Sequence, residues 1–124
     1  MKYLLLAVVV LGSIFMFMHN SNAKNLVTYA DLQKKIADKE DIVLLDVRTA
    51  EEFNSGHIPT AVLLPYDQIE DKSEKLLNDK NKEIIVYCRS GRRSAIALDM
   101  LVKLGYTNVK DFGGISRWQG QLEK

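Results

Sequence analysis

The segment Ile84-Ile85-Val86-Tyr87-Cys88-Arg89-Ser90-Gly91-Arg92-Arg93-Ser94 changes abruptly from apolar to polar and basic. It opens with an unbroken apolar run, which is typical of a strand buried on both faces. Residues 94–104 then carry apolar side chains at helical spacing and stop at Gly105. The segment therefore predicts a strand, a tight loop and a helix, with Cys88 at the point where the strand ends.

Outward from this segment, the chain alternates between strand and helix patterns. The apolar run Ile42-Val43-Leu44-Leu45 ends at Asp46, much as the later run ends at Cys88. Further strands are predicted at 61–64 and 109–112, and further helices at 29–39, 50–54, 67–77 and around Trp118. This alternation predicts one α/β domain with a mostly parallel sheet and helices on both faces.

Three helices are predicted to begin at capping signals. These signals are Thr28 with Asp31, Thr49 with Glu52, and Asp67 with Glu70. In such a pair the first side chain accepts a hydrogen bond from the backbone of the third helical residue, and the acidic side chain reaches back.

The composition of the 124-residue chain excludes several classes of protein. Hydrophobic residues make up 47% and charged residues 27%, as in an ordinary globular domain. The formal net charge is +1, whereas a protein that binds nucleic acid usually carries a basic excess, so no nucleic-acid partner is expected. Any positive field that attracts an anion must be local.

Residues 1–23 have the pattern of a targeting segment. Lys2 precedes a long apolar stretch, and the polar end Ser21-Asn22-Ala23 suits signal-peptide cleavage. The apolar stretch is long for a signal and short for a spanning helix, so an uncleaved anchor is the alternative, and only then would the protein contact the membrane. In either case residues 24–124 form the exported domain, and a periplasmic location is expected.

The carboxyl ends of parallel strands meet at one edge of a sheet, where ligands bind in open α/β folds. Asp46 and Cys88 are both predicted there, with Arg48 close by. Asp46 and Arg48 either shape the active loop or form a structural ion pair, and the second interpretation is favoured. His57 is expected to fix the turn beside Pro59, because a lone histidine provides neither a triad nor a metal site.

Cys88 is the only cysteine, so it cannot form a disulfide within the chain. A strand-to-helix loop turns its backbone N–H groups inward above a helix N-terminus, which favours an anion. Arg89, Arg92 and Arg93 add positive charge, although at least one is expected only to face solvent. These features predict a depressed pKa and a nucleophilic thiolate rather than an inert buried cysteine.

Two chemistries use a cysteine in such a loop: attack on phosphorus or arsenic, and attack on a sulfane sulfur. In Cys-dependent phosphatases an arginine follows the cysteine after five residues, and here that position is Ser94. Arg93 closes a loop that is one residue shorter, which suits a sulfur atom better than a phosphoryl group. A small phosphatase or arsenate reductase is therefore the weaker alternative.

These motifs together resemble the single-domain rhodanese family of thiosulfate sulfurtransferases, and the targeting segment is similar to that of its exported phage-shock type. The matching stretches are residues 44–48, 52–53, 56–61, 86–94, 105–106 and 113–118, so the resemblance spans about residues 26–120. One departure is Thr60, where the family usually has glycine.

The resemblance implies a three-layer fold with a five-stranded, mainly parallel sheet, and a reaction in two steps. Cys88 would take the outer sulfur of thiosulfate as a persulfide and then pass it to cyanide or a thiol. The backbone N–H groups of Arg89, Ser90, Gly91, Arg92 and Arg93 would hold the sulfur, with Arg92 and Arg93 around the anion. No metal or organic cofactor is implied. A sulfur carrier that serves a partner protein is the alternative of a different class.

Overall fold

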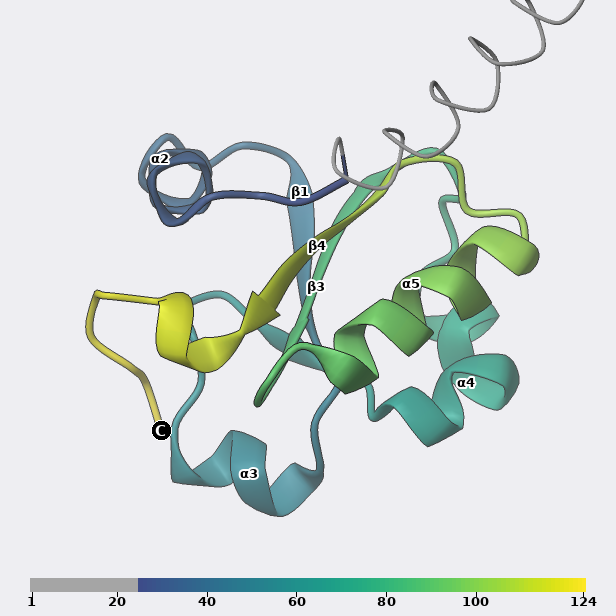
Figure 1. Ribbon diagram of the computed structural model, residues 1–124. Helices are drawn as coiled ribbons and strands as arrows, with labels where there is room; N and C mark the ends of the chain where they lie inside the picture. The colour runs from purple at the N-terminus through teal and green to yellow at the C-terminus, as the bar shows by residue number, and fades with distance from the viewer. Residues whose placement is uncertain (1–24) are drawn as a thin grey trace, which may run out of the picture.

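The computed structural model describes residues 25–124, which form a parallel four-stranded sheet between two layers of helices (Figure 1). The strands are β1 (Ile42–Asp46), β2 (Val62–Leu63), β3 (Glu83–Cys88) and β4 (Val109–Gly114), in the order β2-β1-β3-β4. The α-helices are α2 (Tyr29–Ala37), α3 (Ala50–Ser55), α4 (Ile69–Leu76) and α5 (Arg92–Lys103). Short 3₁₀ helices occupy Tyr66–Gln68 and Ile115–Arg117.

The α/β class and the parallel sheet are confirmed, with one difference in the number of strands. The expected fifth strand is reduced to a single parallel bridge between Leu26 and Asp111 at the free edge of β4. Two backbone hydrogen bonds hold this bridge, from the Val27 N–H to the Asp111 carbonyl at 2.9 Å and from the Asp111 N–H to the Asn25 carbonyl at 2.7 Å.

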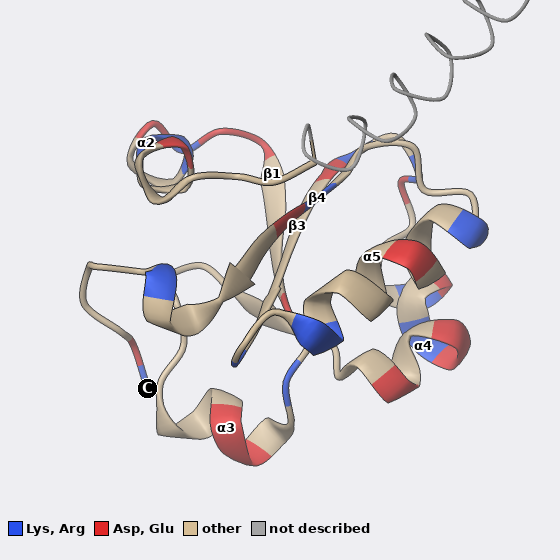
Figure 2. Ribbon diagram, in the orientation of Figure 1, with Lys and Arg blue, Asp and Glu red and all other residues tan. Residues whose placement is uncertain are grey.

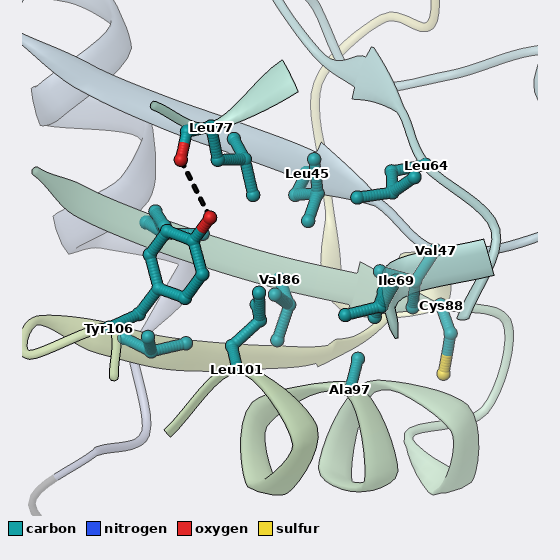
Figure 3. Close-up of a cluster of buried hydrophobic side chains, with 12 residues drawn as sticks. Leu45, Val47, Leu64, Ile69, Leu77, Val86, Cys88, Ala97, Leu101 and Tyr106 are labelled. Carbon is teal, nitrogen blue, oxygen red and sulfur yellow. Dashed lines mark hydrogen bonds between the residues drawn. The ribbon is translucent and has the colours of Figure 1, made fainter. Parts of the chain in front are cut away.

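The alternation of side chains along the strands produces two separate cores. Leu45 and Val86 point toward α4 and α5, where they pack with Leu101 and other buried residues (Figure 3). Leu44 and Ile85 point to the other face, which α2 and the C-terminal segment cover (Figure 1). Because both faces are covered, the strands have the continuous apolar sequence from which they were predicted.

The helix boundaries show which capping signals act. Thr49 and Glu52 form a complete capping box at the start of α3. At α2 only half of the expected box forms, because the Thr28 hydroxyl accepts from the Asp31 N–H but the Asp31 side chain makes no return bond.

The predicted helix start at Asp67 was wrong. Pro65 leads into a 3₁₀ turn over Tyr66–Gln68, and α4 begins only at Ile69, without a side-chain cap. The C-terminal helix is likewise a 3₁₀ turn, and Trp118 lies just after it.

The predicted targeting segment, residues 1–23, lies outside the residues that the structure describes. Between residues 25 and 124, none of the helices has the length and apolar character needed to cross a membrane.

Candidate active site

Cys88 is the last residue of β3, and its side chain points toward α4 and α5 (Figure 3). This direction follows from the strand alternation, because Val86 on the same strand faces the same core. The residue is 0% exposed and contacts an apolar cluster on one side. An inert buried cysteine was the disfavoured alternative, yet Cys88 is buried against apolar side chains on one side, while a polar loop covers its other side.

The loop after β3 wraps backbone donors around the sulfur. The Gly91 N–H donates to Cys88 Sγ at 3.0 Å. Burial alone would raise the pKa of the Cys88 thiol, but the Ser94 hydroxyl and the N–H groups of Ser94, Gly91 and Ser90 lower it, and the net shift is downward. The thiolate is thus favoured although the side chain is buried.

Ser94 contacts the candidate site, although sequence reasoning used it only to argue against a phosphatase. It is fully buried in the first turn of α5, and its hydroxyl donates to the Gly91 carbonyl at 3.0 Å. A hydroxyl has one proton, so the same group can donate to the sulfur instead once a negative charge forms there. The feature of the sequence that could have indicated this contact was the position of Ser94, directly after the basic loop.

Alkylation of Cys88 by iodoacetamide is expected to follow a pH midpoint below that of an ordinary cysteine, because only the thiolate reacts. Replacing Ser94 with alanine removes one stabilising donor, so the midpoint should move to higher pH. The measurement is the alkylation rate of folded protein as a function of pH. An unchanged midpoint in Ser94→Ala would show that the hydroxyl does not stabilise the thiolate.

Two glycines fix the shape of the loop. Gly91 has a φ of 102° and precedes α5 as its N-cap, so the helix begins two residues before the predicted Ser94. Gly114 on β4 lies beneath the loop, where an added Cβ would be 2.7 Å from the Arg89 carbonyl oxygen and 3.2 Å from Ser90 Cα. No side chain fits between β4 and the loop.

Gly114→Ala is expected to slow by about tenfold or more the sulfur uptake that the resemblance implies, because displacement of the loop misaligns the donors around the sulfur of Cys88. Gly114 has a φ of −86°, which alanine adopts freely, so the effect is steric and not due to backbone strain. Sulfur uptake followed by mass, with a thermal melt of the same sample, separates a displaced loop from an unfolded domain. Uptake at the rate of the unmodified protein would contradict the close contact.

Asp46 and Arg48 form a buried ion pair on the face opposite Cys88. Arg48 Nη2 donates to the Asp46 carboxylate at 2.6 Å and to the Gly56 carbonyl at 2.7 Å. The Tyr87 hydroxyl also donates to Asp46, at 2.7 Å, and accepts from the Ile58 N–H at 3.1 Å. These are the contacts of a structural pair that ties the end of β1 to the turn after α3.

Tyr87 has a role that the sequence did not reveal. Burial raises the pKa of its phenol, with a further contribution from Asp46, so the hydroxyl keeps its proton and remains a donor. His57 behaves as expected for a turn residue: its ring stacks on Phe53, and its backbone bridges to Glu123. Trp118 is half-buried against Tyr29 and does not line the sulfur site.

The three loop arginines have different environments. Arg89 and Arg92 are exposed, and within residues 25–124 neither forms an ion pair. Arg93 is half-buried, and its Nη1 and Nη2 donate to the two carboxylate oxygens of Glu52 at 2.7 and 2.9 Å. The basic start of α5 thus meets the acidic helix α3 (Figure 2).

Metal chemistry has no evident site in the described part of the chain, where no group of three or more histidine, cysteine, aspartate or glutamate side chains is placed to hold an ion. The chemistry available to the site is that of a thiolate in a ring of N–H donors beside exposed cations.

The chain belongs to the rhodanese-like domain family, whose model matches residues 28–121. A sulfurtransferase of Allochromatium vinosum is 37% identical over 95 residues, covering 76% of this chain and 87% of the relative. The thiosulfate sulfurtransferase PspE of Escherichia coli is 34% identical over 71 residues, covering 57% of this chain and 68% of that protein. The solved BH2092 protein of Bacillus halodurans matches with a TM-score of 0.75 at 32% identity, covering 90% of this chain and 84% of that one.

The family and the site agree on the general chemistry. The protein is a sulfur-transferring enzyme that takes sulfur from a donor and passes it to an acceptor.

Proposed function

We propose that Cys88 accepts the outer sulfur of thiosulfate and transfers it to cyanide or a thiol. The observation that supports this most directly is the N–H donor of Gly91 at 3.0 Å from Cys88 Sγ, in a loop that also lowers the pKa of the thiol. A persulfide carries its negative charge on the outer sulfur, and the donors that already act on Cys88, the N–H groups of Ser90, Gly91 and Ser94, support stabilisation of that charge.

The reaction balances in two steps without a cofactor. The Cys88 thiolate attacks the outer sulfur of thiosulfate, the S–S bond of thiosulfate breaks, and sulfite leaves with the bonding electron pair. Cyanide then attacks the outer sulfur of the persulfide and forms thiocyanate, while the thiolate of Cys88 is regenerated. A thiol acceptor would leave as its own persulfide.

The exposed cations Arg89 and Arg92 support a small anionic donor, because they place positive charge in the loop that follows the buried sulfur. Oxyanion capture by an arginine, as in the phosphatase alternative, has weaker support. Ser94 occupies the position of that arginine, and the Arg93 guanidinium is bound by Glu52.

The test is the intact mass of residues 24–124 after incubation with thiosulfate and again after addition of cyanide. A gain of one sulfur atom that disappears as thiocyanate forms is the expected result. Fully reduced protein that gains no sulfur would contradict thiosulfate as donor. Loading only by a persulfide-bearing protein would instead favour the sulfur-carrier alternative.

Export to the periplasm is a further proposal, supported by the sequence of residues 1–23. N-terminal sequencing of the protein purified from its native cell envelope distinguishes cleavage after Ala23 from an uncleaved anchor.

A further inference from the structure

The pairing of Glu52 with Arg93 joins two elements that are distant in sequence. Arg93 is the second residue of α5, directly after the active loop, and Glu52 lies in α3, 41 positions earlier in the chain. Both carboxylate oxygens are used, at 2.7 and 2.9 Å, in the parallel two-bond geometry that fixes orientation as well as distance.

Glu52 is itself held rigidly. Its carboxylate accepts from the Thr49 N–H at 3.2 Å and from the Thr49 hydroxyl at 3.1 Å, within the capping box of α3. Thr49 follows Arg48, which the buried pair with Asp46 anchors to β1. A series of polar contacts, joined by the peptide bond between Arg48 and Thr49, therefore runs from the sheet through α3 to the first turn of α5.

The pair stays charged over the whole physiological range. Hydrogen bonds from Arg93, with those of Thr49, lower the pKa of the Glu52 carboxyl to about 2 against the opposing effect of burial. The side chains of Arg93 and Glu52 are 19% and 26% exposed, so solvent screens this pair less than a fully exposed one.

We propose that Glu52 and Arg93 are positioning residues, which hold the first turn of α5 against α3 and thereby keep the N–H donors of the loop directed at Cys88. Arg93 acts through Glu52 rather than on the substrate, and Arg89 and Arg92 are left as the cations that meet an anion. This role rests on the proposed function only for its effect on sulfur transfer, because the alignment of donors around the thiolate exists without any sulfur donor.

The decisive variant is Glu52→Gln, because two effects move the pKa of Cys88 in opposite directions. Loss of a negative charge by itself favours the thiolate and lowers the pH midpoint of alkylation by iodoacetamide. Loosening of the donors disfavours the thiolate and raises that midpoint. We expect a rise, together with sulfur uptake from thiosulfate that is about tenfold slower at saturation and a KM within about twofold of the original.

Glu51→Gln is the matched control, because it removes the same charge from the residue that precedes Glu52 in α3 and is exposed. Its midpoint should stay the same or fall. Arg93→Lys keeps the positive charge but replaces two parallel hydrogen bonds with a single ammonium, so it should raise the midpoint as well. If Glu52→Gln does not fold, Arg93→Lys carries the test alone.

The double variant Glu52→Gln with Arg93→Gln should have an alkylation midpoint no higher, and sulfur uptake no slower, than Arg93→Gln alone. The reason is that the two residues act through one contact. A midpoint in Glu52→Gln and Arg93→Lys that does not rise, with uptake at the original rate, would overturn the proposal. Alkylation needs no sulfur donor, so failure of thiosulfate as substrate leaves this measurement intact.

Discussion

Cys88→Ser is expected to abolish sulfur uptake from thiosulfate, with a fall of at least about 10³-fold that brings the rate to background. A serine hydroxyl does not ionise near neutral pH and cannot form a persulfide. The measurement is the intact mass after incubation with thiosulfate, together with thiocyanate formation on addition of cyanide.

The same variant should keep its fold. The serine hydroxyl can accept the hydrogen bond that the Gly91 N–H now donates to the sulfur, and the side chain is of similar size. A thermal melt close to that of the unmodified protein is the control. Sulfur bound by folded Cys88→Ser would mean that the acceptor lies elsewhere in the chain.

Arg48→Met is expected to destabilise the domain by about 3–5 kcal/mol, because it leaves the carboxylate of Asp46 buried and without its cation. Asp46 is 0% exposed, and Arg48 is 6% exposed and donates to both carboxylate oxygens. A loss of this size lowers the melting temperature of a domain of about 100 residues by more than about 10 °C. Urea unfolding monitored by circular dichroism gives the free energy directly.

Two further variants make this result specific. Lys34→Met breaks a surface pair with Asp38, whose side chains are 75% and 51% exposed, and should leave the free energy of unfolding nearly unchanged. Adding Asp46→Asn to Arg48→Met removes the unpaired charge and should recover part of the lost stability. A double variant as unstable as the sum of the single losses would exclude an effect of the unpaired charge.

The strands and the nucleophile were predictable because their signals are local. Ile84 to Tyr87 and Ile42 to Leu45 are apolar without interruption, which is sufficient for strands covered on both faces. Cys88 was predicted as the nucleophile because it lies at the end of such a strand. The capping box of Thr49 was predicted from four consecutive residues.

The remaining features depend on residues that approach only in the folded chain. Glu52 was expected as a cap and Arg93 as an anion ligand, and nothing in a separation of 41 positions indicates that they meet. Tyr87 looked like one more apolar strand residue, although its hydroxyl donates to Asp46. The steric role of Gly114 depends on the register that places it opposite Cys88.

Thr60 shows how a departure from a family pattern is accommodated. Its φ is 74°, in the left-handed region that glycine adopts at little cost and a β-branched residue rarely adopts. The turn therefore has a conformation that glycine adopts more easily, and a threonine bears the strain.

The position of β4 at the edge of the sheet affects the order in which parts of the chain can fold during synthesis. Every strand pair is parallel, so each joins segments that a long crossover separates, and such contacts form slowly. While the chain is being synthesised, β3 has an open edge until residues 109–114 arrive, and the segment around Leu26 has no strand to pair with. Gly114, the floor beneath the loop, is the last residue of that strand. The reactive cysteine is therefore synthesised well before the strand that completes its surroundings. A nascent chain thus contains the thiol before the active site around it can form.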